Sequence, residues 1–497
     1  MAVSRRLPGW AVLAVCCAAQ FMVVLDFSIV NVALPAMRSS LGLSIAGQQW
    51  VVNAYALTFA GLLLCGGRAA DLLGKRGVFL AGLGLFTLAS LAGGLSQEGA
   101  ELVAARAVQG LGGAVLAPAT LSVLTTTYTE PYSRARALGA WSATAASGAA
   151  TGVLAGGLLT QLVSWRAVLF VNVPIGAVLF VLAWYALATA GPGQGAKLRE
   201  LDLGGALLAT AGLSVLVYGV VSTGSHPWGS TRTIAVLAVG AALLATFVVV
   251  EARVVTRPLV PLGVFANRSL ATANAVAMMV GAVLFSSFFF LSLFLQQVDG
   301  YSALKAGLAF LPQALVTLVT SLSVSRLVRR VSPRRLLFAG PLVAAGGLVW
   351  LSQLSVGAGY FSDMLGPFLL AGAGLGACFV PMTLAATAGV APKEQGLASG
   401  IVNTSRFVGG SLGLAALAAL AASRTSQLLA GQPNLTAVAR ARALTAGYDR
   451  AFLVAAALCV AASLAGAMVP SSASRRRPAE VGLRAVAGQQ EPVVIEA

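Results

Sequence analysis

One acidic residue in the middle of a long apolar segment is the first candidate for chemistry in this chain. Asp26 lies within the apolar run from Trp10 to Pro35, and no other carboxylate can be placed as deep in such a run. A charge near the bilayer centre costs roughly 2.5–3.5 kcal/mol on insertion scales, so residues of this kind usually mark an ion or proton path. Because burial disfavours the charged form of a carboxyl group, we expect Asp26 to bind and release a proton. The alternative is a structural acid that stays ion-paired or hydrogen-bonded.

Two arginines also lie inside apolar segments. Arg106 could pair with Asp26 and so couple protonation to movement. Alternatively, its side chain extends to the nearby outer face, since Glu98 and Glu101 lie close to it in sequence. Arg406 is expected within reach of the cytoplasmic face.

Three further polar side chains are candidates for lining a substrate cavity: Asn31, Tyr55 and Gln109. For Asn31 the alternative is a hydrogen bond to a neighbouring helix. For Tyr55 the alternative is packing or anchoring at the membrane interface.

The residues argue against an enzyme. The only histidine, His226, stands in a short loop, so neither a histidine-based triad nor a histidine-rich zinc site can form. The run Gly74–Arg76 lacks the upstream glycine and the following Ser or Thr of a phosphate-binding loop. The five cysteines lie in apolar segments without metal or redox spacing. We therefore expect no cofactor and no metal, with an ion gradient as the energy source.

A short polar loop separates the second and third apolar segments. Its glycines permit a sharp turn, and its acid could pair with arginines or a helix N-terminus across two halves of the protein. Such contacts would stabilise one transport state and break in another. The residues of this gating loop are Gly67, Arg68, Asp71, Gly74, Lys75 and Arg76.

Four glycines follow one another on the fifth apolar segment: Gly148, Gly152, Gly156 and Gly157. The first three are spaced by four residues and share one helix face. Small residues on one face allow two membrane helices to pack closely.

The elements that must position these residues are membrane helices. The chain of 497 residues is 58% apolar and 9% charged, whereas soluble proteins carry about 25% charged residues. Fourteen apolar segments are long enough to cross a bilayer, and each must be helical because backbone groups in lipid have to be satisfied within the segment. The expected fold is an all-α membrane protein.

The basic residues indicate the orientation. Alternate loops place 22 of the 32 Lys and Arg residues on one side, which predicts that both termini are cytoplasmic. The net charge of +17 is thereby explained by topology and anionic lipid, not by nucleic acid.

The chain also repeats itself. Gly113-Ala114 with Pro118 returns as Gly376-Ala377 with Pro381, and Arg68 and Arg76 return as Arg326 and Arg334. Two parallel six-helix halves with a site between them are typical of major-facilitator architecture. The expected units are 1–190 (first half), 191–268 (linker with two inserted helices), 269–470 (second half) and 471–497 (disordered cytoplasmic tail).

Taken together, these segments resemble the drug:proton antiporter family with fourteen spans, within the major facilitator superfamily. The gating loop and Arg106–Gly110 are similar to its loop and fourth-span motifs. Leu25–Pro35 matches the first-span motif, with Ser28 where threonine is usual, and Gly148–Gly157 matches the fifth-span motif, with Val153 in place of proline. Ser164–Gly176 and Leu295–Pro312 are also similar to the family. The resemblance implies inward proton flow exchanged for outward movement of a drug or antibiotic.

These observations predict a monomeric, multi-pass exporter of the bacterial cytoplasmic membrane that works by alternating access. The expected substrate is an apolar or monocationic drug or antibiotic, with anions also allowed. Dications are excluded because Asp26 has no second deep carboxylate beside it. One alternative is export of an endogenous metabolite, such as a self-made antibiotic, by the same fold. Another is a non-transporting membrane receptor or scaffold, for which Asp26 would be dispensable.

Overall fold

The computed structural model describes residues 8–187, 201–223, 226–391, 394–430 and 436–470. Within these ranges 14 helices are long and apolar enough to cross a membrane, which confirms the predicted all-α fold. The first-half helices are α1 (Gly9–Leu41), α2 (Ile45–Leu73), α3 (Lys75–Leu95), α4 (Gly99–Thr127), α5 (Pro131–Leu162), α6 (Ala167–Phe170) and α7 (Asn172–Ala186). The others are α8 (Leu203–Ser222), α9 (Thr231–Arg253), η2 (Leu262–Ala266), α10 (Arg268–Leu293), η3 (Phe294–Val298), α11 (Ala303–Leu327), α12 (Pro333–Leu351), η4 (Tyr360–Met364), α13 (Leu365–Thr387), α14 (Gln395–Leu429) and α15 (Ala437–Ala467).

Side chains at the helix ends explain where several helices begin. The hydroxyl of Ser44 accepts a hydrogen bond from the backbone N–H of Gly47 at the start of α2. Ser302 and Thr436 cap α11 and α15 in the same way. Such caps satisfy N–H groups that have no partner within the helix.

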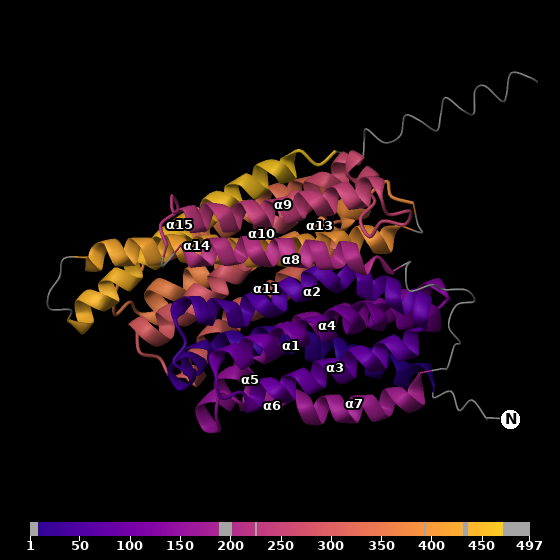
Figure 1. The fold of residues 1–497 in the computed structure, drawn as a ribbon, viewed down its shortest axis with the longest axis horizontal. Coiled ribbons are helices and arrows are strands. Elements are labelled where there is room, and N and C mark those ends of the chain that lie inside the picture. Colours follow the sequence, from indigo (N-terminus) through magenta and orange to yellow (C-terminus); the bar gives the residue numbers. More distant parts are fainter. Residues whose placement is uncertain (1–7, 188–200, 224–225, 392–393, 431–435, 471–497) are drawn as a thin grey trace, which may run out of the picture.

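The two halves repeat one packing scheme. In the first half α2 packs on α4, α1 on α5, and α3 on α4 and α7. In the second half α11 packs on α13, α10 on α14, and α12 on α13 and α15. The internal repeat seen in the sequence therefore reappears as a repeat of contacts. Figure 1 shows the first half, in indigo to magenta, beside the second half, in orange to yellow.

The inserted helices α8 and α9 pack on each other, and α8 touches both halves through α2 and α14. A small apolar cluster joins them: Leu57 of α2, Leu213 and Val217 of α8, and Ala415 of α14 are all buried. The pair therefore lies against the seam between the halves (Figure 1). Residues 188–200, which include the first ten residues of the expected linker 191–268, and the expected tail 471–497 lie outside the described residues.

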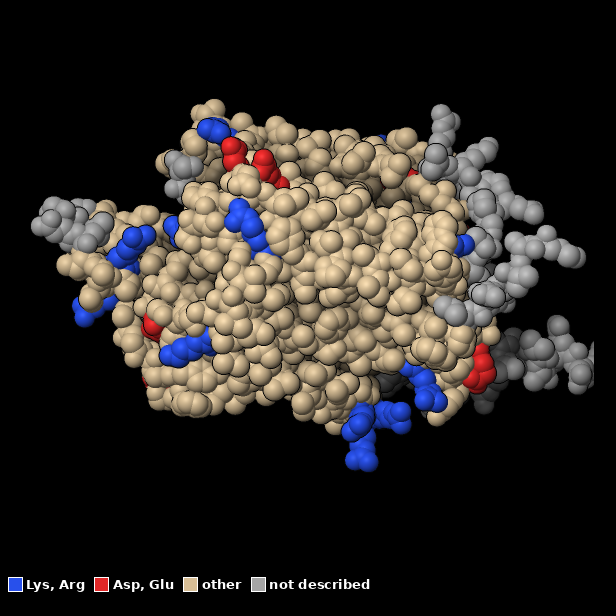
Figure 2. All heavy atoms as spheres, turned by 90° about the horizontal axis from the view of Figure 1, so that it is seen from below, with Lys and Arg blue, Asp and Glu red and all other residues tan. Residues whose placement is uncertain are grey.

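We call one end of the bundle the Gly74 end, because it carries the α2–α3 turn; α1 begins there and α15 ends there (Figure 1). The opposite end is called the Gly157 end. Figure 2 shows one face of the molecule with a broad uncharged area between charged groups nearer its ends. An uncharged belt of this kind is what a bilayer core requires.

The halves are in close contact toward the Gly157 end. A side-chain carbon added at Gly157 of α5 would lie 2.7 Å from the backbone oxygen of Ala303 of α11, so only glycine fits there. Ser292 Oγ of α10 donates to the backbone oxygen of Asn31 at 2.9 Å, and Gln296 Nε2 donates to that of Val32 at 3.1 Å. The two halves are thus joined by backbone contacts between α5 and α11 and by hydrogen bonds from α10 and η3 to α1.

Candidate functional site

Asp26 lies at the centre of a buried polar network in the first half. Its side chain is fully buried, and Oδ2 forms an ion pair with Arg106 Nη1 at 2.6 Å. Oδ1 accepts hydrogen bonds from Gln109 Nε2 and Asn172 Nδ2, each at 2.8 Å. The carboxylate therefore has partners for both oxygens, which is the condition for keeping a buried charge.

Arg106 is the cationic partner, and it does not extend to an outer face. It is 1% exposed, and its Nε donates to the backbone oxygen of Val51 of α2 at 3.2 Å. Its guanidinium carbon lies 4.4 Å from the centre of the Tyr55 ring. The structure thus shows the Asp26–Arg106 pair, one of the two arrangements that the sequence left open. The proton-coupling role of the pair stays a prediction.

Two residues of this network were not among the predicted site residues. Ser90 Oγ of α3 accepts from Gln109 Nε2 at 3.1 Å and from Asn172 Nδ2 at 3.0 Å, and it donates to the backbone oxygen of Leu169 at 2.9 Å. Ser90 therefore orients both amides that hold Asp26. In the sequence, Asn172 lies within Ser164–Gly176, a stretch that resembles the family but was assigned no role, and Ser90 has no signal apart from its polarity.

The glycines of α5 determine how closely α1 approaches. A side-chain carbon at Gly148, Gly152 or Gly156 would lie 3.0, 2.8 or 2.6 Å from a backbone oxygen of α1. Those oxygens belong to Phe21, Leu25 and Ile29, on both sides of Asp26. The predicted close packing is confirmed, and it places the backbone of α1 against α5 along the turns that carry Asp26.

Gln109 belongs to the Asp26 network in this conformation, not to an open cavity. Asn31 donates to the backbone oxygen of Phe27 at 2.9 Å, within its own helix. Asn31, Tyr55 and Gln109 are all buried. Their exposure to a substrate in another conformation stays a prediction.

Aromatic rings connect this site to the second half. Phe27 of α1 packs against Phe285 of α10 at 4.6 Å and Phe407 of α14 at 5.7 Å between ring centres. Phe59 of α2 lies 4.6 Å from Phe407 and stacks on Tyr55 at 5.8 Å. We call Phe27, Tyr55, Phe59, Phe285 and Phe407 the interface aromatic cluster.

In this conformation Asp71, Lys75 and Arg76 of the gating loop make their contacts within the first half. Asp71 Oδ1 accepts from Ser122 Oγ of α4 at 3.0 Å, and Lys75 Nζ donates to the Ser122 backbone oxygen at 3.2 Å. Arg76 donates to the backbone oxygen of Trp184 at 2.7 Å and lies over its ring. In this conformation the Ser122 hydroxyl of the same half is the hydrogen-bond partner of Asp71. The expected pairing of Asp71 across the halves, in another transport state, stays a prediction.

Arg68 is a gating-loop residue that contacts the segment between α9 and α10. It donates to the backbone oxygens of Arg257 and Pro258, both at 2.7 Å. These residues lie between α9 and α10, so Arg68 links α2 to the segment that leads into the second half. Gly74 has a φ of 99°, which favours glycine at this turn.

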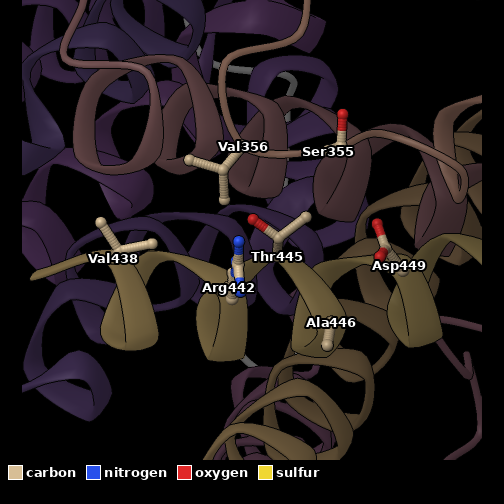
Figure 3. A pocket seen from close by; sticks show the side chains of 7 residues that line it. All are labelled: Ser355, Val356, Val438, Arg442, Thr445, Ala446 and Asp449. Atoms are coloured by element: carbon tan, nitrogen blue, oxygen red, sulfur yellow. The ribbon is translucent and has the colours of Figure 1, made fainter. Parts of the chain in front are cut away.

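A separate pocket of about 390 Å³ lies at the Gly157 end of the second half. Figure 3 shows that its residues come from α15 and from the segment before η4: Ser355, Val356, Val438, Arg442, Thr445, Ala446 and Asp449. None of them belongs to the Asp26 network. Within the described ranges, no group of three or more His, Cys, Asp or Glu side chains could hold a metal ion.

Among the described residues, twelve membrane helices in two repeated halves, two further helices inserted between the halves in the chain, and a buried ion pair beside the interface are features of a membrane transporter of the secondary type. Residues 16–414 match the Major Facilitator Superfamily, and the chain belongs to this family of transporters. It is therefore a transporter and not an enzyme.

Relatives and solved structures agree with this assignment. The chain is 44% identical over 485 residues to the "Cephamycin export protein CmcT" of Amycolatopsis lactamdurans, covering 97% of each chain. It is 41% identical to the "Puromycin resistance protein pur8" of Streptomyces alboniger, over 85% of this chain and 83% of that protein. The fold matches a bacterial homolog of the human lysosomal transporter Spinster with a TM-score of 0.66 and 18% identity, over 94% and 98% of the two chains.

Proposed function

We propose that this protein exports an antibiotic or a similar small molecule across the bacterial cytoplasmic membrane in exchange for protons. The observation that carries the proposal is the buried Asp26–Arg106 pair, set next to the interface between the two halves. The names of the relatives support the export direction, because they describe antibiotic export or resistance.

The composition of the network supports proton coupling. Protonation of Asp26 would remove the negative partner of Arg106 and leave a guanidinium in a buried site. Because an unpaired buried charge is costly, protonation would favour a rearrangement of α1, α3, α4 and α7, the helices that carry the network. Proton binding and helix movement would thereby be linked.

The conformation itself supports an alternating-access cycle. The Gly157 end is held together by the α5–α11 contact, whereas Asp71 at the Gly74 end is bonded within its own half. We assign the Gly74 end to the cytoplasm because the basic loops predominate there. The structure then corresponds to a state with its outer side closed, and Asp71 would find a partner across the halves in the opposite state.

The substrate would be a small molecule with no more than one positive charge. Asp26 is already neutralised by Arg106 and offers no second carboxylate for a dication. We propose a monomer whose energy source is the proton gradient and which needs no cofactor. Export of an endogenous antibiotic is the second candidate, and the cephamycin export relative gives it specific support.

The test is drug survival and proton-driven efflux in a susceptible host, comparing the wild type with Asp26→Asn at matched membrane expression. We expect the wild type to raise survival and the variant to lose efflux while still inserting. The non-transporting receptor or scaffold predicts no efflux from either protein. Normal efflux by Asp26→Asn would show that the acid is structural.

A further inference from the structure

Arg406 is a second arginine inside the bundle, and its surroundings differ from those of Arg106. It lies on α14, next in sequence to Phe407 of the interface aromatic cluster. Among the described residues Arg406 forms no ion pair, and its side chain is only partly buried. Within the described part of the chain, its side chain donates one hydrogen bond, from Nη2 to Asn403 Oδ1 of the same helix, at 2.7 Å.

The neighbours of Arg406 are aromatic. Its guanidinium carbon lies 5.5 Å from the ring centre of Phe379 on α13 and 5.6 Å from that of Phe407. Cation–π contacts at this distance offset only part of the cost of taking a guanidinium out of water. Arg406 therefore keeps most of its donors and its full charge for another partner.

The location is suitable for a ligand. Phe27, Phe379 and Phe407 are partly exposed, although they lie on inner helices of both halves. These three partly exposed rings offer apolar surface, and Arg406 offers a planar cation beside Phe379 and Phe407. A guanidinium binds a carboxylate through two parallel hydrogen bonds, and aromatic walls bind an aromatic or apolar body.

We propose that Arg406 is the charge-recognition residue of the substrate site and that the preferred substrates are aromatic or apolar monoanions bearing a carboxylate. The inference deepens the proposed function and rests on it. It narrows the proposed substrates, which were molecules with no more than one positive charge, to monoanions. It thereby replaces the expected preference for apolar or monocationic compounds. In the structure Arg406 lies beside Phe379 and Phe407, and its expected reach to the cytoplasmic face stays a prediction.

Adjacent residues would connect the anion site to the proton site. Phe27 follows Asp26 in sequence, Phe407 follows Arg406, and the two rings are in contact. Protonation of Asp26 would free Arg106 to attract the anion directly, and the anion and the proton would then bind together. Exchange requires the opposite, that each weakens the binding of the other. We therefore infer that the two sites are coupled through movement of the Phe27 and Phe407 rings.

Three fluorescent compounds with one ring system test the proposal: dansyl-glycine (anion), dansyl-glycinamide (neutral) and dansyl-ethylenediamine (cation). Binding is measured at pH 7.5 with purified full-length protein. We expect the wild type to bind the anion at least tenfold more tightly than the other two compounds, which is about 1.4 kcal/mol. Arg406→Gln should lose this preference and still bind the neutral compound, and Arg406→Lys should keep part of it.

Arg442→Gln is the matched control, since Arg442 lies in the separate pocket of Figure 3 and should behave as the wild type. Equal binding of the three compounds by the wild type would overturn the proposal. A preference that survives in Arg406→Gln would do so as well. So would absent dansyl-glycine binding in a protein that exports another compound. If the wild type neither exports nor responds to a proton gradient, the proposed function fails instead.

Discussion

Removal of Arg106 should expose the cost of an unpaired acid. In Arg106→Met the Asp26 carboxylate would keep its hydrogen bonds from Gln109 and Asn172. It would lose the guanidinium 2.6 Å away, its only cationic partner among the described residues. The site stays closed to water because Asp26 is fully buried. Breaking one side of a buried ion pair costs about 3–5 kcal/mol, a factor of about 100 to several thousand in the folding equilibrium.

The double variant Asp26→Asn/Arg106→Met carries neither charge. It should regain most of the lost stability, so the two substitutions together should cost much less than the sum of each alone. Thermal unfolding of the purified proteins in lipid nanodiscs measures this cycle. Arg440→Met on an exposed position of α15 is the control and should melt as the wild type.

Two results would refute the reasoning. One is an Arg106→Met protein that melts at the wild-type temperature, which would mean that Asp26 is neutral or hydrated without its partner. The other is a double variant that is no more stable than Arg106→Met, which would mean that the two charges act independently.

Three other predictions concern the outer contact, the gating loop and pH. Gly157→Val should lower efflux at least tenfold because a side chain cannot fit against Ala303. Gly139→Ala is the control and should not lower efflux, since a side-chain carbon at Gly139 would have nothing within 4 Å. Wild-type efflux by Gly157→Val would contradict the proposed outer closure. Asp71→Asn should keep the hydrogen bond from Ser122 and the wild-type melting temperature, yet lose efflux. Wild-type efflux by this variant would show that the charge of Asp71 has no role in the transport cycle. Outside the membrane, burial raises the pKa of Asp299 above 3.8, against the opposing effects of the Gly357 N–H and Lys305. A raised pKa means that the folded state holds the proton more tightly than the unfolded state, so stability falls as pH rises through the range above 3.8. Asp299→Asn should flatten the change in melting temperature between pH 4 and pH 7, and an unchanged slope would count against this assignment.

The fold could be predicted from the sequence because each membrane helix is determined by its own segment of the chain. Each span contains a predominantly apolar window of 18 residues, and in lipid the backbone hydrogen bonds of such a segment are satisfied within it when it forms a helix. Asp26 and Arg106 could be identified for the same reason, since a charge stands out in an apolar run. Gly148, Gly152 and Gly156 could be identified by their spacing, which places them on one helix face.

Other parts of the site depend on which helices meet. Ser90 and Asn172 are ordinary polar residues in membrane helices, and their role appears only when α3 and α7 bring them to one carboxylate. The partner of Asp71 depends on the transport state, so a single sequence motif cannot identify it. The ring contacts between Phe27 and Phe407 join residues 380 positions apart and follow from the packing of the two halves.

The most direct test of the central claim is transport in proteoliposomes with an imposed pH gradient. The substrate would be a compound that the wild type exports from cells, and the rates of wild type and Asp26→Asn would be compared with and without the gradient. We predict that the gradient accelerates the wild type only, while Asp26→Asn still exchanges substrate for substrate. An Asp26→Asn protein that responds to the gradient as the wild type does would contradict proton exchange through Asp26.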